Sequence, residues 1–232
     1  MKSTIKRMAI TAITVLPLIT ACNHQDNSGM ELLYPNAMVT IKTTEDASSS
    51  YFQLDDETTL KVTNLTKPLY GGKEVRAFVN FTEVDEDPTP YDKAVKMNWT
   101  DSIRTKNAVP YPVLEGEDKY GNDPIEILRD WTTVVEDGYF TMRFQTYFGN
   151  PSIAHELNLL YGGNPENPYE IELRHNAHGD WNDRLGDGYI AFRLKDLPDT
   201  KGETVKLTLK WNSFSGEKTY QFDYCTREGD GI

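Results

Sequence analysis

The chain has 232 residues, of which 26% are charged, and its formal net charge at pH 7 is −12. This length allows one large or two small domains. The acidic balance disfavours nucleic acid binding, because phosphates need a basic face, and it also disfavours electrostatic docking on anionic lipid.

The first 21 residues have the composition of an export signal. Lys2, Lys6 and Arg7 form a charged head, and an uncharged apolar run follows up to residue 21. The run is too short to cross a bilayer, which takes about 20 apolar residues. The sequence Ile19-Thr20-Ala21-Cys22 resembles the lipobox of bacterial lipoproteins, where the signal is cut before the cysteine. By that resemblance, residues 1–21 are the signal peptide and Cys22 becomes a lipidated N-terminus that carries palmitate.

Cleavage before Cys22 changes the charge and the cysteine content of the chain. The formal charge falls from −12 to −15, because the leader carries three cationic side chains and no carboxylate. Acylation of Cys22 leaves Cys225 without a partner, so no intramolecular disulfide forms. A lone thiol at the end of a strand is typical of a small, partly buried core residue. Asn23 is not the aspartate associated with inner-membrane retention, so we expect an outer-membrane anchor and leave its face open.

Residues 22–36 begin with a polar stretch that contains Gly and Ser and is typical of a tether. From residue 37 apolar and polar side chains alternate, and this two-residue period predicts strands. The alternation is clearest in Glu74–Phe81, where Phe78 is an apolar residue on the otherwise polar face of the strand. This is compatible with both faces being covered. The strands expected in an N-terminal domain of residues 37–106 are Ala37–Lys42, Tyr51–Leu54, Thr58–Val62, Glu74–Phe81 and Lys93–Trp99.

Residues 107–123 contain prolines, glycines and an acidic run, which predicts a linker. In residues 124–232, seven segments each have one polar and one apolar face. This pattern predicts two antiparallel sheets packed face to face, and the architecture is all-β. Ile125–Trp131 is ambiguous, because its apolar spacing also fits one or two helical turns. The expected strands are Trp131–Val135, Tyr139–Phe148, His155–Tyr161, Tyr169–His175, Ile190–Leu194, Val205–Trp211 and Tyr220–Tyr224.

Several short runs spread over the chain look like the NigD-like family. They are Tyr34-Pro35-Asn36-Ala37, Glu74-Val75-Arg76-Ala77, Tyr120-Gly121-Asn122-Asp123-Pro124, Arg174-His175-Asn176-Ala177, Val205-Lys206-Leu207-Thr208-Leu209-Lys210-Trp211, Phe214-Ser215-Gly216-Glu217-Lys218 and Phe222-Asp223-Tyr224-Cys225. The resemblance implies an OB-like N-terminal barrel and a C-terminal β-sandwich, in lipoproteins of Gram-negative gut and oral anaerobes. Counts of five and seven strands agree with these two folds. The family name comes from association with a bacteriocin gene cluster, which suggests a role in immunity and identifies no activity.

A polar loop in the second domain carries the residues that we single out for ligand binding: His178, Asp180, Trp181 and Asp183. An aromatic ring among hydrogen-bonding groups can stack on a sugar or a peptide ring. The alternative is that Trp181 folds back and covers the end of the sandwich.

The same loop also invites two metal-site interpretations. His175 and His178, with Asp180 and Asp183, have donor types that zinc uses, and residues 180–188 superficially resemble a calcium loop. Arg184 and Ala191 stand where an EF-hand needs ligands, which argues against calcium there. A connecting loop without a metal or cofactor is the interpretation we favour.

No motif in the sequence indicates catalysis. His155-Glu156 begins like the zinc-peptidase motif, but Leu159 replaces the second histidine and the segment alternates like a strand. There is no G-x-S-x-G, no phosphate-binding loop and no C-x-x-C. Asp101-Ser102-Ile103 resembles the O-glycosylation acceptor of the same bacterial group, and this three-residue match predicts modification of Ser102.

These features favour a non-enzymatic envelope lipoprotein that displays two β domains to a protein or glycan partner. Its contact with the membrane is expected through the acyl chains on Cys22. One alternative is a hydrolase that uses carboxylates gathered between the two domains, because glycoside cleavage needs two carboxyl groups about 5 to 9 Å apart. A second alternative is an immunity protein that sequesters a bacteriocin.

Overall fold

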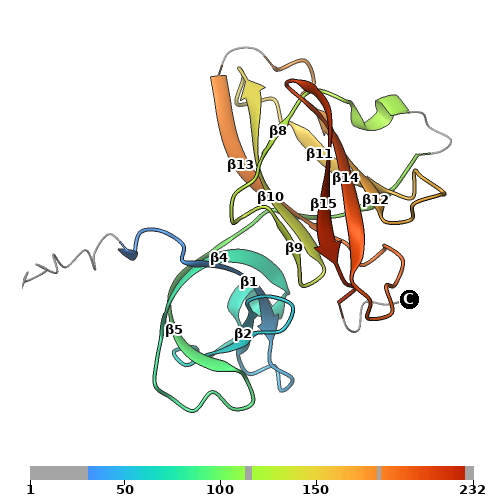
Figure 1. Cartoon of the computed structure of the whole chain (residues 1–232). Coiled ribbons are helices and arrows are strands. Elements are labelled where there is room, and N and C mark those ends of the chain that lie inside the picture. The colour runs from blue at the N-terminus through green and yellow to red at the C-terminus, as the bar shows by residue number, and fades with distance from the viewer. Residues whose placement is uncertain (1–30, 113–116, 182–183, 228–232) are drawn as a thin grey trace, which may run out of the picture. The chain divides into compact units, whose positions relative to one another are not determined.

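A computed structural model of the chain describes residues 31–112, 117–181 and 184–227. Residues 34–232 form one unit of mutual contacts, and its regular structure is almost entirely β (Figure 1). Two short 3-10 segments, η1 (Leu69–Gly72) and η2 (Glu117–Tyr120), interrupt the strands. No helix in the described part of the chain is long and apolar enough to cross a membrane.

The N-terminal domain is a closed barrel with the strand order β1-β2-β3-β5-β4. Its strands are β1 (Ala37–Thr43), β2 (Ser50–Gln53), β3 (Thr59–Val62), β4 (Val75–Glu83) and β5 (Lys93–Ser102). Closure pairs β3 with β5 in parallel, and the other pairs are antiparallel. The expected OB-like barrel is confirmed, and the inward residues that fill it are Ala37, Val39, Ile41, Phe52, Leu60, Val62, Ala77, Val79 and Val95.

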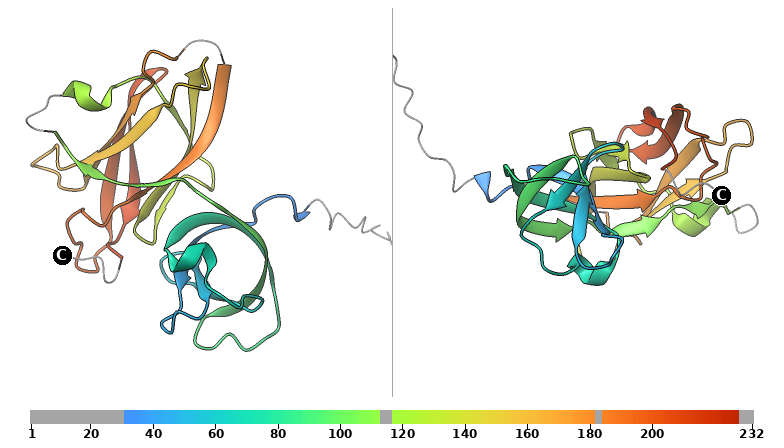
Figure 2. Two further views of the ribbon diagram at one scale, coloured as in Figure 1. Left: turned by 180° about the vertical axis from the view of Figure 1, so that it is seen from behind. Right: turned by 90° about the horizontal axis from the view of Figure 1, so that it is seen from below.

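The C-terminal domain is a sandwich of two five-stranded sheets. One sheet has the order β6-β13-β10-β8, with β9 paired to β10, and the other has the order β15-β14-β12-β11-β7. Figure 2 shows the two layers from behind and from below. The strands are β6 (Thr105–Asn107), β7 (Val109–Pro110), β8 (Glu126–Leu128), β9 (Val134–Glu136), β10 (Tyr139–Phe148), β11 (Glu156–Tyr161), β12 (Glu170–Asn176), β13 (Arg184–Arg193), β14 (Val205–Ser213) and β15 (Gly216–Tyr224).

The expected β-sandwich is confirmed, but it has more strands than the seven predicted, and its sheets are mixed rather than purely antiparallel. Ten strands are present among the described residues of this domain. The three that the sequence did not predict are β6, β7 and β8, which have only two or three residues each. Segments that short cannot display an alternation. The chain also visits the opposite sheet, as β13, between β12 and β14, and this crossover makes β12 and β14 parallel neighbours. The ambiguous segment Ile125–Trp131 contains β8 and no helix.

Apolar side chains of both sheets meet in one core, as the alternating pattern requires. Leu207, Leu209 and Trp211 of β14 all belong to it, and so do Phe140 and Met142 of β10. Burial of such side chains contributes about 25 cal/mol for each Å² removed from water. The sandwich therefore has its own hydrophobic core, separate from the barrel core.

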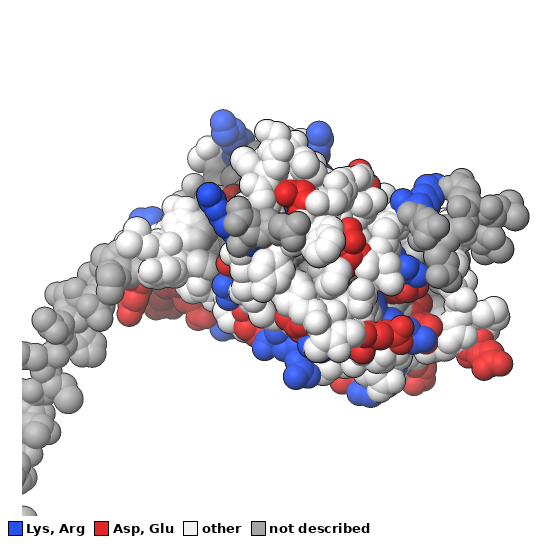
Figure 3. Space-filling model, turned by 90° about the horizontal axis from the view of Figure 1, so that it is seen from above, with Lys and Arg blue, Asp and Glu red and all other residues white. Residues whose placement is uncertain are grey.

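The chain passes from the barrel to the sandwich without a free linker. Only Ile103 and Arg104 separate β5 from β6, and β6 pairs in parallel with β13. Residues 109–110, which the sequence placed in the linker, form β7 and pair with β11. A third apolar cluster joins the domains: Met38, Ile103, Tyr139 and Ala191, with Phe78 and Val134 packed against it. Phe78 is thus covered on the outer face of β4. Elsewhere, on the face shown in Figure 3, acidic and basic side chains are interspersed.

Candidate functional site at the barrel–sandwich junction

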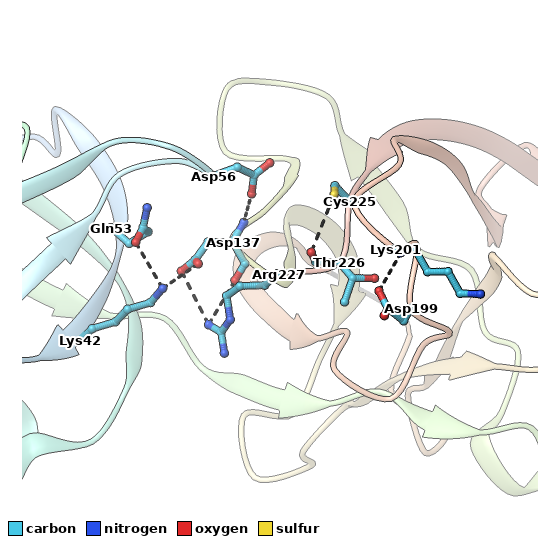
Figure 4. A pocket seen from close by; sticks show the side chains of 10 residues that line it. Lys42, Gln53, Asp56, Asp137, Asp199, Lys201, Cys225, Thr226 and Arg227 are labelled. Atoms are coloured by element: carbon cyan, nitrogen blue, oxygen red, sulfur yellow. Dashed lines mark hydrogen bonds and ion pairs between the residues drawn. The ribbon is translucent and has the colours of Figure 1, made fainter. Parts of the chain in front are cut away.

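A cavity of about 830 Å³ lies where the barrel meets the sandwich (Figure 4). Barrel strands β1 and β2 contribute to its lining, and so do the β9–β10 turn, the loop before β14 and the segment that follows β15. Its lining includes three carboxylates and three cationic side chains. The residues that line it are Lys42, Gln53, Asp56, Asp137, Asp199, Lys201, Gly202, Cys225, Thr226 and Arg227.

The turn between β9 and β10 brings a carboxylate into this junction. Asp137 and Gly138 have φ of 46° and 73°, and Tyr139 pairs with Glu136, which is the geometry of a two-residue hairpin turn. Asp and Gly tolerate positive φ better than other residues, so the sequence selects this turn. The turn leaves Asp137 only 3% exposed, with its carboxylate 2.8 Å from Lys42 Nζ of β1.

Arg227 closes the same site from the end of the sandwich. Its Nη1 lies 3.0 Å from Glu74 Oε1 and 3.8 Å from Asp137 Oδ2. Figure 4 shows Lys42 and Arg227 both directed at Asp137. Burial alone raises the pKa of Glu74, but hydrogen bonds from Tyr139 and Arg227 outweigh burial, and the net pKa is lowered. Glu74 is therefore an anion that the fold stabilises.

Arg76 lies fully buried on the outer face of β4. Its guanidinium donates to Thr40 Oγ1 at 3.2 Å in the barrel and to Thr141 Oγ1 at 3.3 Å in the sandwich, and it pairs with Glu136 of β9. A buried charge is stable only when paired and hydrogen-bonded, and these contacts satisfy both needs. Arg76 thus ties the two domains together.

Tyr139 lies between the same groups and is 1% exposed. Its hydroxyl donates to Glu74 and accepts from Arg193 Nε at 3.2 Å. Burial, together with the neighbouring Glu74 carboxylate, raises the pKa of Tyr139 well above its usual value. The guanidiniums of Arg76, Arg193 and Arg227 lie 6.0, 5.5 and 5.9 Å from the ring centroid, within cation–π distance.

The three cavity carboxylates accept contacts from cations and backbone N–H groups. Asp137 is held by Lys42 and Arg227, and Asp56 accepts the backbone N–H of Asp137. Asp199 accepts the backbone N–H of Lys201 at 2.8 Å within its own turn. Each of the three carboxylates is thus bound by a cation or by a backbone N–H group.

Cys225 also faces this cavity, directly after β15. It is a free cysteine of intermediate burial, and Thr200 Oγ1 lies 3.6 Å from its Sγ. The expectation of a small, partly buried residue at a strand end is confirmed. Cys22, the predicted lipidation position, lies outside the described residues.

The sequence-predicted ligand loop is separate from this cavity. Trp181 is 55% exposed, and His178 is exposed with a φ of 52°. Asp180 instead points back into the fold, where its carboxylate accepts the backbone N–H groups of Gly149 and Asn150. These bonds, the one from Asn150 first, lower the pKa of Asp180. Asp183 lies outside the described residues.

The histidines do not form the cluster that the zinc interpretation requires, because His175 pairs with His155. His175 is buried, and its Nε2 lies 3.0 Å from Nδ1 of His155 rather than beside His178. Burial first, and then His155, lower the pKa of His175, so the neutral imidazole is favoured. His178 lies 3.6 Å from Glu156, the first residue of β11. Within the described residues, no three His, Cys, Asp or Glu side chains gather so that they could hold a metal.

Sequence reasoning missed the junction residues. Lys42, Arg76 and Glu136 occupy polar positions on strand faces, and such positions normally face water. The one signal was Phe78, which shares the outer face of β4 with Arg76 and implied that this face is covered. Ser102, the suggested glycosylation position, is exposed at the end of β5, and its modification stays a prediction.

Comparison with known proteins decides the family. The profile of the NigD-like N-terminal OB domain matches residues 38–103, and that of the NigD-like C-terminal beta sandwich domain matches residues 109–224. The chain belongs to the NigD-like family. A search of curated proteins finds no significant match.

Solved structures agree with this NigD-like assignment. One from Parabacteroides distasonis, described as toxin-related, is 33% identical with a TM-score of 0.66, and the match covers 82% of this chain and 92% of that one. A NigD-like immunity protein from Bacteroides caccae has 17% identity and a TM-score of 0.57, over 82% and 96% of the two chains. A structure from Bacteroides fragilis described as a lipoprotein has 12% identity and a TM-score of 0.52, over 83% and 98%. The last two show a shared fold.

Proposed function

We propose that this NigD-like protein is a lipid-anchored envelope protein that presents its barrel and sandwich to a partner and catalyses no reaction. The observation that carries the proposal is the ion network at the junction. Arg76 is satisfied by both domains, and Asp137 is held by Lys42 and Arg227. These groups stabilise one arrangement of two domains, which is what a recognition scaffold needs.

The anchor is supported by the sequence. The leader of residues 1–21 ends before Cys22, and residues 23–29 supply a polar tether. A structural neighbour from Bacteroides fragilis is described as a lipoprotein. A single acyl chain binds membranes only marginally, so stable attachment requires the several chains of a lipoprotein anchor. We place the anchor in the outer membrane.

Radiolabelled palmitate tests the anchor directly. The wild-type protein, expressed in a Gram-negative bacterium, should incorporate label and fractionate with the outer membrane. Cys22→Ala should lose the label and appear in the soluble envelope fraction, while Cys225→Ala, the matched cysteine control, should keep it. Label on the Cys22→Ala protein, or no label on the wild type, would refute the anchor.

An immunity role is the second candidate, and the NigD-like immunity protein from Bacteroides caccae favours it. In that case the partner is a bacteriocin that the envelope protein sequesters. Deletion of the gene should raise sensitivity to bacteriocins made by neighbouring strains, and complementation should restore resistance. Unchanged sensitivity across a panel of producers would remove this candidate and leave the wider binding role.

The hydrolase alternative gains no support from the geometry, because the junction carboxylates are bound by cations or backbone N–H groups. It is tested by assaying wild type and Asp137→Asn on glycosides, esters and peptides. Turnover by the wild type that Asp137→Asn abolishes would overturn the non-catalytic assignment.

A further inference from the structure

A second hollow, of about 380 Å³, lies on the surface where the barrel and the sandwich adjoin. We name it the aromatic groove and define it by Tyr34, Phe78, Trp131, Tyr189, Asp101 and Arg143. It combines residues of β4 and β5 with residues of β10, β13 and the loop before β9. It shares no lining residue with the junction cavity.

The groove exposes large aromatic side chains that the fold holds in place. Tyr34 is 68% exposed, Trp131 58% and Tyr189 37%. Phe78 packs edge-to-face against both Trp131 and Tyr189, with ring centroids 6.0 and 4.8 Å apart. Clustered exposed aromatics of this kind mark interaction sites, because isolated surface aromatics are ordinary and gathered ones are not.

The turn that carries Trp131 is fixed by its neighbour. Asp130 accepts the backbone N–H of Thr132 at 2.9 Å and also its hydroxyl, and Arg143 Nη1 lies 3.3 Å from the same carboxylate. These hydrogen bonds, against the effect of burial, lower the pKa of Asp130. Trp131 therefore projects from a preorganised turn, which reduces the ordering cost of binding.

The charged groups of the groove are unequally satisfied. Arg143 is bound by Asp130 and by Asp187, whose Oδ2 lies 2.8 Å from Nη2. Asp101 lies opposite Phe78 in the β4–β5 register and is exposed. Among the residues that the structure describes, no side chain forms an ion pair with it. The groove thus contributes an uncompensated carboxylate beside aromatic faces, in a chain whose net charge is −12.

We propose that the aromatic groove binds a basic segment of a protein partner, with a Lys or Arg side chain over Trp131 and its charge paired to Asp101. This rests on the proposed binding function and names the partner chemistry. A cation gains from the ring face and from the carboxylate together. A neutral sugar carries no charge to pair with the Asp101 carboxylate, whereas a Lys or Arg side chain pairs with it through a charge-assisted hydrogen bond.

The test uses the mature lipidated protein purified in detergent and a fluorescent peptide of sequence Gly-Lys-Arg-Lys-Gly, with Gly-Gln-Gln-Gln-Gly as the neutral comparison. Trp131→Ala should weaken binding of the basic peptide about fivefold. Asp101→Asn should weaken it about threefold and reduce its salt dependence. The matched controls Tyr147→Ala and Asp85→Asn, at an exposed aromatic residue and an exposed carboxylate outside the groove, should leave binding unchanged.

Three outcomes would overturn the proposal. Equal weakening by Asp85→Asn would assign binding to net charge. Trp131-dependent binding of neutral oligosaccharides without binding of the basic peptide would assign the groove to glycan. Trp131-dependent binding to neutral phospholipid vesicles by protein with Cys22→Ala would assign it to the membrane surface.

Capture of a partner separates a wrong assignment of the aromatic groove from a wrong assignment of the binding function. If a partner captured from native membranes is retained equally by wild type, Trp131→Ala and Asp101→Asn, the function stands and the groove does not. If no partner is captured and Cys22 takes up no palmitate, the proposed function itself fails.

Discussion

The junction network and the aromatic groove are built from the same residue types and differ in how far their charges are satisfied. At the junction, fully buried Arg76 is shared by both domains and Tyr139 is enclosed by guanidiniums. In the groove, Trp131 stays 58% exposed and Asp101 lacks an ion-pair partner among the described residues. Satisfied and buried groups stabilise the fold, whereas exposed and unsatisfied ones remain available for a partner. Substitutions at the two sites should therefore separate stability from binding.

Arg76→Ala should give the largest effect on stability. It leaves Glu136 without its cation and opens a cavity between the domains, so the free energy of unfolding should fall by about 3 kcal/mol. Urea denaturation followed by tryptophan fluorescence measures this loss. Lys93→Ala removes the exposed pair with Glu83 and should cost less than about 1 kcal/mol. An equal loss in the free energy of unfolding for the two variants would show that Arg76 contributes no more than an exposed ion pair.

Tyr139→Phe should have an intermediate effect. It keeps the ring among the three guanidiniums but removes the hydroxyl that bonds to Glu74 and Arg193. We expect a loss of about 1 to 2 kcal/mol, because buried polar partners are left unsatisfied. The control is Tyr51→Phe, at a partly buried tyrosine of the barrel. It should lower the urea midpoint of unfolding less than Tyr139→Phe does.

The junction should also weaken in acid through Glu74. Its folded-state pKa is lowered, so its contribution to stability is present above its unfolded pKa, about 4.3, and is lost as the pH falls through the folded value. Glu74→Gln should therefore be less stable than wild type at pH 7, and the gap should narrow below about pH 4. A gap of constant size from pH 7 to pH 3 would contradict this assignment.

Trp131→Ala should have the smallest effect on stability. An exposed side chain away from the core changes the free energy of unfolding by about 0.5 kcal/mol or less. Its thermal midpoint should match that of Trp181→Ala within experimental error. A large destabilisation would mean that Trp131 packs as part of the domain contact and would place the groove with the junction.

Most of the barrel follows from the sequence because its strands are long enough to alternate. In Glu74–Phe81, Ala77 and Val79 enter the barrel core and Phe78 is covered outside, as the pattern indicated. For the sandwich, the sequence predicts the fold class but not the number or the order of the strands. Strands of two or three residues carry no period, and the crossover of β13 between β12 and β14 is set by sheet packing rather than by any local signal.

The candidate sites depend on contacts between distant residues, which a single sequence does not show. His155 and His175 meet only because β11 and β12 are neighbours. Polar neighbours in the sequence single out Trp181, whereas the alternating pattern predicts Trp131 as part of a strand. The structure begins β9 at Val134, so Trp131 lies in a loop and is exposed. Arg76 stands on the polar side of an alternating strand, and it is buried only because the sandwich covers that side.

The most direct test is a calorimetric titration of the Lys/Arg peptide into wild-type and Trp131→Ala protein whose urea midpoints agree. We expect the folded Trp131→Ala variant to bind about fivefold more weakly, while Tyr147→Ala binds like wild type. Equal affinity of all three proteins would contradict the division between a junction that stabilises and a groove that binds.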